Sequence, residues 1–131
     1  MIMDTSAAVA ILRREPEAAA MQTAIELAPA LAISAASVLE LAIVTRASGP
    51  ELVDRFLAAL AIEVLAVDAD HLRWARFALQ NYGRGSGSPA RLNFGDCLTY
   101  GAAIASSRPL LFKGEGFTHT DVRSALEESS T

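Results

Sequence analysis

The sequence contains almost no cysteine and almost no lysine. Cys97 is the only cysteine among 131 residues, which excludes an intrachain disulfide and a cysteine-based zinc site. Lys113 is the only lysine, and acidic residues outnumber basic ones by 15 to 11. A net charge of -4 is not typical of a nucleic-acid-binding surface. Nucleic acid is still compatible with this charge, because metal ions held by clustered carboxylates offset the repulsion of phosphates.

The sequence also lacks a long uninterrupted apolar run. Its most apolar long window, residues 27–45, contains Pro29, Ser34 and Glu40, which argues against a membrane-spanning helix. The first residues carry no basic segment and are interrupted by Asp4, so we expect no secretory leader and a cytoplasmic location. Hydrophobic residues nevertheless make up 52% of the chain. We therefore expect another chain to cover part of its apolar surface.

Short apolar runs alternate with longer helical patterns along the chain. We expect strands at residues 1–3, 31–34, 63–67 and 109–112, with helices between them. This alternation predicts an α/β fold, in which helices flank both faces of a short central parallel sheet of four or five strands. The length fits a single domain over residues 1–131, with a polar tail from about residue 124 to 131.

The helix predicted after Asp68 carries two large aromatic residues. We expect Trp74 and Phe77 in the core and His71 on the surface of the first turn. The next stretch, residues 82–89, holds three glycines, two serines and one proline, and it is predicted to be a flexible loop rather than a domain linker.

Asp96 lies where a helix is predicted to begin. Asn93 has the character of an N-cap, and Asp96 stands at the third helical position of a capping box. This local role is sufficient to explain an acid at this position, since a helix cap contributes ~1 kcal/mol to the stability of the helix. The alternative is that Asp96 belongs to a site formed with other acids.

Two further acids stand at positions that favour a site. Asp4 directly follows the first predicted strand, and ligands of open α/β sheets bind at that edge. Its alternative role is to cap the next helix.

Glu40 lies in a helix that is apolar nearly all round, where a carboxylate is costly unless it is paired or bound to a cation. Its alternative is to reach solvent at the helix edge.

Additional charged residues lie near the predicted strand ends. Glu115 and Asp121 follow the fourth strand, although Asp121 is also suited to capping a short helix that begins at Val122. Arg13 and Arg14 are candidates for contact with a substrate backbone, with a solvated turn as the simpler interpretation.

These acids favour a hard metal ion. Asp4, Glu40, Asp96 and either Glu115 or Asp121 are predicted to gather at one sheet edge. Ligand sets made only of oxygen favour Mg2+ or Mn2+ over zinc. Paired ions of this kind activate water and stabilise the leaving oxygen of a phosphodiester.

Four blocks of the sequence carry a family resemblance, in matching order and spacing. They are Met3-Asp4-Thr5-Ser6-Ala7, Ser34-Ala35-Ala36-Ser37-Val38-Leu39-Glu40, Leu92-Asn93-Phe94-Gly95-Asp96-Cys97, and Pro109-Leu110-Leu111-Phe112-Lys113-Gly114 with Phe117 and Thr120-Asp121. With these blocks the chain resembles PIN-domain ribonuclease toxins of the VapC type, the toxic halves of type II toxin-antitoxin pairs.

The resemblance implies a metal-dependent endoribonuclease that cleaves RNA with Mg2+ or Mn2+. It also implies a VapB-like antitoxin whose C-terminal part occupies the site, and homodimers within a larger toxin-antitoxin complex. Asp4, Glu40 and Asp96 match the family's core acids, and Thr5 and Asn93 match the polar positions beside them.

The sequence departs from the family at the fourth acid. Relatives of this type carry Asp directly before the Phe of the last block, whereas this chain has Gly116 before Phe117. Glu115, one residue earlier and with a longer side chain, and Asp121 are both candidates. We favour Glu115.

Two other functions compete with this interpretation. A haloacid-dehalogenase-like phosphohydrolase also places an Asp after its first strand and a Lys after a late strand. In this chain, Asp4 and Lys113 occupy such positions. That chemistry needs a second Asp two residues after the first, where this chain has Ser6. The other alternative is a non-catalytic PIN-fold protein that only binds a partner.

Two apolar helices are candidates for contact with partner chains. Residues 38–47 and 52–61 are predicted to contribute to a homodimer seam and to a groove for an amphipathic antitoxin helix. Phe56 and Leu60 are the residues expected to test this seam.

Overall fold

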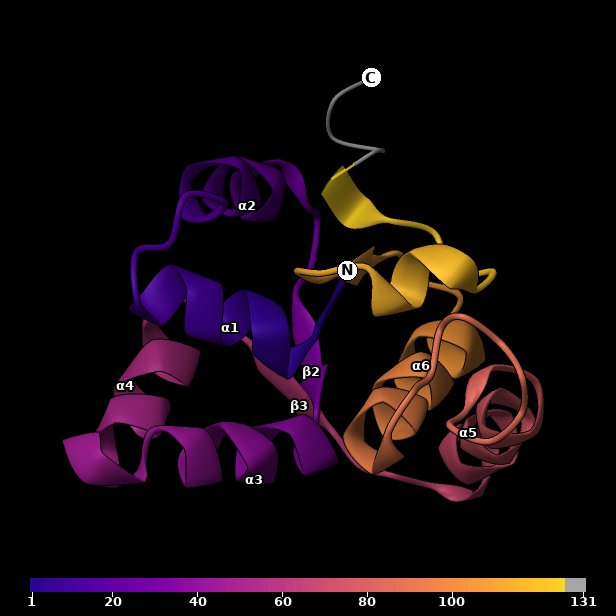
Figure 1. The fold of residues 1–131 in the computed structure, drawn as a ribbon. Helices are drawn as coiled ribbons and strands as arrows, with labels where there is room; N and C mark the ends of the chain where they lie inside the picture. The colour runs from indigo at the N-terminus through magenta and orange to yellow at the C-terminus, as the bar shows by residue number, and fades with distance from the viewer. Residues whose placement is uncertain (127–131) are drawn as a thin grey trace.

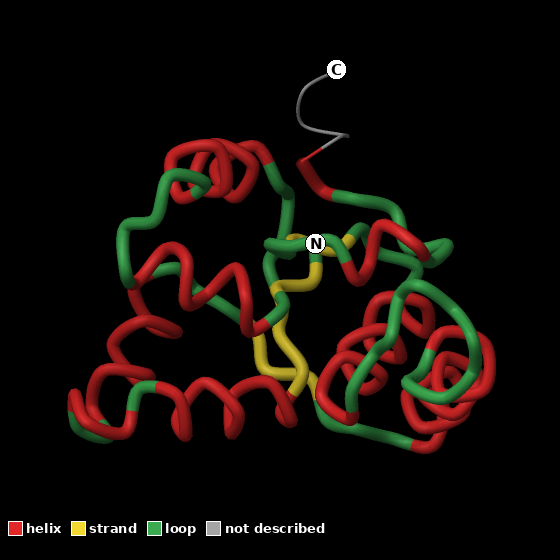
Figure 2. The backbone as a smooth tube through the Cα atoms, in the orientation of Figure 1, coloured by secondary structure: helices red, strands yellow, loops and turns green. Residues whose placement is uncertain are grey.

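Four short parallel strands form the centre of the computed structural model, which describes residues 1–126 (Figure 2). The strands are β1 Ile2–Met3, β2 Ala32–Ser34, β3 Glu63–Leu65 and β4 Leu110–Leu111. They pair in the order β3-β2-β1-β4, all parallel, with Met3 opposite Ile33 on one side and Leu111 on the other. The prediction of a parallel sheet of four or five strands is confirmed, with four strands present in the described residues.

The helices begin almost immediately after the strands. They are α1 Thr5–Leu12, α2 Ala18–Leu27, α3 Ala35–Val44, α4 Glu51–Ala59, α5 Ala69–Tyr82 and α6 Phe94–Ser106, with short 3-10 helices η1 Arg46–Ser48 and η2 Gly116–His119. Asp4 and Ser34 each follow or end a strand and accept a hydrogen bond from an amide of the next helix. The chain therefore turns from strand to helix at the same edge of the sheet. Within residues 1–126, no helix has both the length and the apolar character to cross a membrane.

Two separate apolar clusters cover the two faces of the sheet. Successive strand residues point to opposite faces, so each strand contributes to both clusters. The cluster with α1, α2, α3 and α4 receives Met3, Ile33 and Leu111, and the cluster with α5 and α6 receives Ile2, Ala32 and Leu110. Figure 1 shows the two groups of helices on either side of the sheet. The prediction of helices on both faces is confirmed.

The orientation of α5 differs from the sequence prediction. His71 is buried, whereas Phe77 is 38% exposed and Trp74 is only partly buried. The buried side of α5 carries His71, Ala75 and Ala78, because this side packs against α6 at a bare glycine, Gly101. The predictions of a surface His71 and a core Phe77 were therefore wrong.

The segment after η2 also differs from the prediction. No helix begins at Val122, whose amide instead donates to the hydroxyl oxygen of Thr120 at 3.3 Å. The amide of Leu110 donates to the carbonyl of Arg123 at 2.8 Å, and Ala125 is buried. The predicted polar tail therefore does not begin at residue 124. Its last part, residues 127–131, lies outside the described residues.

Candidate active site

Asp4 lies at the middle of the sheet edge where the strands end. Its amide donates to the Leu111 carbonyl at 2.9 Å, which continues the pairing of β1 with β4. Its carboxylate Oδ2 accepts the amide of Ser6 at 3.0 Å and so caps α1. The side chain is 5% exposed. Asp4 is thus a helix cap and an edge carboxylate at once, and the two interpretations of the sequence are compatible.

Asp96 combines the same two roles at the start of α6. Its amide donates to Asn93 Oδ1 at 2.9 Å, and the Asn93 amide donates to Asp96 Oδ2 at 3.0 Å. The predicted capping box is therefore confirmed. The box engages only one of the two carboxylate oxygens, so it orients Asp96 without using up its capacity to bind a cation.

The electrostatics of Asp96 connect it to the two other core acids. Burial raises the pKa of this carboxyl most, and the amide of Asn93 lowers it. The charges of Asp4 and Glu40 raise the pKa further, while the charge of Arg84 lowers it. The charges of two acids from other elements therefore reach Asp96, and a cation beside Asp96 would relieve this repulsion.

Glu40 reaches this space from α3. Its carboxylate lies against Gly95, which directly precedes Asp96. The reason given by the sequence was nevertheless wrong, because α3 is not apolar and buried all round. Leu39 and Ile43, beside Glu40 on this helix, are 66% and 56% exposed. The position of Glu40 follows from its contact with α6 and not from a buried helix.

A buried chain of hydroxyl groups links the three helices that position the acids. Thr5 Oγ1 donates to the Ser37 carbonyl at 3.4 Å, and the hydroxyl groups of Ser37 and Thr99 lie 3.1 Å apart. Thr5 follows Asp4, Ser37 precedes Glu40 by three residues, and Thr99 follows Asp96 by three residues. The sequence analysis missed Ser37 and Thr99. The sequence feature that could have indicated them is a hydroxyl side chain about one helical turn from Glu40 and from Asp96, within mostly apolar helices.

The two candidates for the fourth acid flank η2. Neither Glu115 nor Asp121 is among the charges that shift the pKa of Asp96. Glu115 is exposed at the start of η2. Asp121 Oδ1 accepts the hydroxyl of Tyr100 at 2.7 Å, so its predicted role as a helix cap was wrong.

The arginines are placed differently from the prediction. Arg13 and Arg14 are exposed at the far end of α1, which separates them from Asp4 by roughly 12 Å of helix. Arg84 instead lies close enough to Asp96 to lower its pKa, and the sequence analysis missed it. The sequence feature that could have indicated it is that Arg84 is the only cation within the glycine-rich stretch of residues 82–89.

The chemistry of the acids fits a hard divalent cation. All candidate ligands are carboxylate oxygens, which suit Mg2+ or Mn2+. Their mutual repulsion at Asp96 also fits a site completed by positive charge. Among residues 1–126, however, no three His, Cys, Asp or Glu side chains are close enough together to hold a single ion as they stand. The acid side chains would have to move closer together to coordinate an ion.

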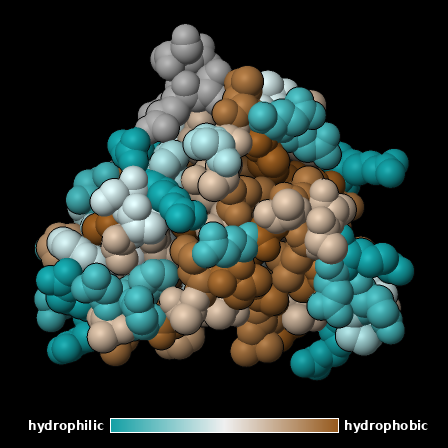
Figure 3. All heavy atoms as spheres, turned by 180° about the vertical axis from the view of Figure 1, so that it is seen from behind, coloured by the Kyte–Doolittle hydropathy of each residue, from teal (hydrophilic) through white to brown (hydrophobic). Residues whose placement is uncertain are grey.

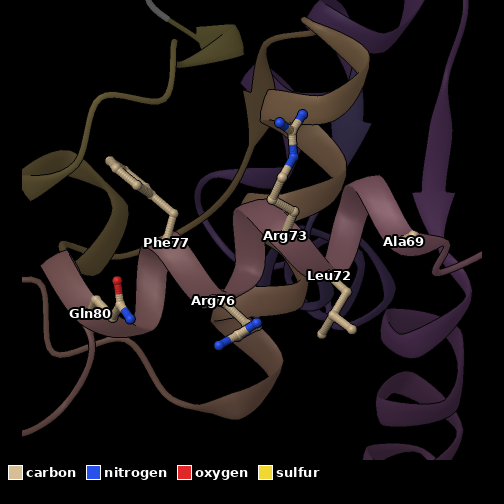
Figure 4. A pocket seen from close by; sticks show the side chains of 6 residues that line it. All are labelled: Ala69, Leu72, Arg73, Arg76, Phe77 and Gln80. Atoms are coloured by element: carbon tan, nitrogen blue, oxygen red, sulfur yellow. The ribbon is translucent and has the colours of Figure 1, made fainter.

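An open pocket of about 380 Å³ on the outer side of α5 is separate from the acids (Figure 4). It is lined by Ala69, Leu72, Arg73, Arg76, Phe77 and Gln80. The Arg73 guanidinium lies 3.2 Å from Asp70 Oδ1 and 5.2 Å from the centre of the Trp74 ring. The pocket contains none of the predicted site residues, so the acid cluster remains the candidate site.

The family profile described as "PIN domain" matches residues 1–123. The chain therefore belongs to the PIN-domain family. Membership of this family excludes the haloacid-dehalogenase-like phosphohydrolase. That alternative depended on Lys113, whose amine forms ion pairs with Glu15 and Glu17.

Several curated proteins are similar to the chain over nearly its whole length. Ribonuclease VapC42 of Mycobacterium tuberculosis is 50% identical over 129 residues, covering 95% of this chain and 98% of its own. Ribonuclease VapC28 of the same species is 47% identical over 131 residues, covering 97% and 98%. Ribonuclease VapC30 of that species is 46% identical over 127 residues, covering 93% and 95%.

Proposed function

We propose that the protein is an Mg2+- or Mn2+-dependent endoribonuclease, the toxin of a type II toxin-antitoxin pair, acting in the cytoplasm. The observation that carries the proposal is that the Glu40 carboxylate lies against Gly95, the residue before Asp96. Hydrogen bonds through Thr5, Ser37 and Thr99 link the helices that follow or carry the three acids. The similarity to proteins named VapC ribonucleases supports the same activity.

Each residue of the site has a distinct role in this proposal. Asp4, Glu40 and Asp96 hold the metal, and the Asn93 amide keeps the Asp96 carboxylate in place. A bound Mg2+ or Mn2+ supplies an activated water and stabilises the leaving oxygen of the phosphodiester. Arg84, whose charge lowers the pKa of Asp96, is the cation that we propose binds a phosphate of the RNA.

RNA cleavage by the purified chain tests the proposal. The protein, freed of any antitoxin, is incubated with total RNA and Mn2+ or Mg2+, and the new RNA ends are mapped. We expect cleavage that depends on the metal and stops with a chelator. Binding of RNA or of a partner without any cleavage would support the non-catalytic PIN-fold alternative.

Exposed apolar side chains support the proposed partners, a second copy and a VapB-like antitoxin. Seen from behind, apolar residues gather across the middle of the molecule (Figure 3). On α3, Leu39, Ile43 and Val44 are 66%, 56% and 44% exposed. Phe56 of α4 is buried in the core, so it is unsuited to a seam. We therefore assign the homodimer seam to α3.

We expect Ile43→Asp to weaken the homodimer, because it places a charge in an apolar interface. Ile43 is exposed in the single chain, so the fold should be preserved. Light scattering at micromolar concentration should then report a lower mass than for the parent. Leu27→Asp is the matched control, since Leu27 is 68% exposed on α2. Parental mass for a folded Ile43→Asp variant would place the seam elsewhere.

The fourth acid is tested by two matched variants. We propose Glu115 as the peripheral ligand, because it lies between Gly114 and Gly116, whose backbone freedom lets this loop bend towards the ends of the strands. Glu115→Gln should raise the metal concentration at half-maximal cleavage without abolishing activity. Asp121→Asn should mainly lower stability, by ~1 kcal/mol, because it weakens a charged hydrogen bond. A metal midpoint shifted only in Asp121→Asn would assign the ligand to Asp121.

A further inference from the structure

One glycine of α6 stands directly against a carboxylate of the site. A methyl group at Gly95 would lie 2.5 Å from Glu40 Oε2, 3.1 Å from Glu40 Cδ and 3.3 Å from Glu40 Oε1. These distances are shorter than ordinary van der Waals contacts. The whole carboxylate of Glu40 therefore faces the bare Cα of Gly95, and no other residue type leaves this space free.

The backbone does not require glycine at this position. Positive φ angles occur at other glycines, namely Gly49, Gly85, Gly87 and Gly114, and not at Gly95. Gly95 is the second residue of α6, and alanine is better than glycine in a helix by ~0.5–1 kcal/mol. A side chain at this position is therefore acceptable to the helix but not to Glu40.

We infer that Gly95 is a positioning residue, which keeps open the space in which the Glu40 carboxylate lies beside Asp96. The inference rests on the proposed function, in which both acids bind the metal. Because the atoms that a methyl group would meet belong to the end of a flexible side chain, Gly95→Ala displaces the Glu40 carboxylate and leaves the backbone in place. The substitution thus alters the metal site without unfolding the protein.

Calorimetric titration of the full chain with Mn2+ tests this role. We expect Gly95→Ala to raise the Kd for Mn2+ by ~10-fold, as changes beside metal ligands do. Its melting temperature without metal should not fall below that of the parent. Glu40→Asp in the Gly95→Ala background shortens the partner by one methylene and makes room for the methyl group. The two changes together should then raise the Kd by less than the product of their separate effects.

Two outcomes separate this inference from the proposed function. A folded Gly95→Ala variant with parental Mn2+ affinity overturns the role of Gly95, while metal binding by the parent upholds the site. Absence of Mn2+ binding by the parent counts against the proposed function. A crystal structure of metal-free Gly95→Ala then decides the role of Gly95. Displacement of the Glu40 carboxylate supports it, and an unmoved carboxylate overturns it.

Discussion

Asp96→Asn should abolish RNA cleavage and at the same time raise the thermal stability of the protein. Removal of a metal ligand should lower the single-turnover rate by at least ~100-fold, because even changes around such ligands cost 10- to 100-fold. The start of α6 is preserved, because the side-chain oxygen of the new asparagine can still accept a hydrogen bond from the backbone amide of Asn93. The backbone amide of residue 96 can still donate to Asn93 Oδ1. We expect Mn2+ to raise the melting temperature of the parent but not that of Asp96→Asn.

The gain in stability has a defined pH dependence. The fold raises the pKa of Asp96 above its ordinary value of 3.8, first through burial and then through Asp4 and Glu40, so it disfavours the charged carboxylate. This penalty is absent below pH 3.8 and develops as the pH rises through the folded-state pKa. Asp96→Asn should therefore melt higher than the parent at neutral pH but not at about pH 3. Cleavage at the parental rate would refute the site.

Gly101→Ala should destabilise the fold strongly, although it lies in the same helix as Gly95. A methyl group at Gly101 would lie 2.3 Å from the carbonyl oxygen and 3.2 Å from the carbonyl carbon of His71. These are backbone atoms of α5, which cannot rotate away, so α5 and α6 must separate. Overpacking of this kind costs up to ~3 kcal/mol. For a chain of this length, we expect the melting temperature to fall by about 10 °C.

The matched comparison is Gly95→Ala, which makes the same substitution in α6 but meets only a movable side chain. Circular dichroism melts of the two variants without metal should differ clearly, with Gly101→Ala far below the parent. A melt of Gly101→Ala within 2 °C or so of the parent would mean that the helices separate at almost no cost. The close packing of α5 on α6 would then not determine which side of α5 is buried.

The parts of the structure that depend on local sequence were predictable. Asp4 and Asn93 each stand where a turn from strand or loop to helix needs an acceptor, and both cap helices as expected. The contact of Ser37 with Thr99 joins residues 62 positions apart, and no local pattern specifies it. The rotation of α5, which buries His71, likewise depends on its fit against Gly101.

The reason for which the sequence selected Glu40 differs from what the structure shows at this residue. The sequence predicted a costly carboxylate on a helix that is apolar nearly all round, but Leu39 and Ile43, beside Glu40 on α3, are 66% and 56% exposed. A single sequence does not distinguish an apolar helix face that packs in the core from one that stays exposed on the surface of the chain. The contact with Gly95 that actually locates Glu40 depends on how α3 meets α6.

The capping box at Asn93 and Asp96 also has a genetic consequence. A single G-to-A base change converts an Asp codon into an Asn codon, and at Asp96 the product keeps both hydrogen bonds of the box. One point mutation should therefore abolish RNA cleavage without unfolding the protein, and the inactive protein should still bind the partners proposed above. In a population exposed to the active toxin, we expect escape mutants at this codon to accumulate full-length, folded protein rather than degraded chains.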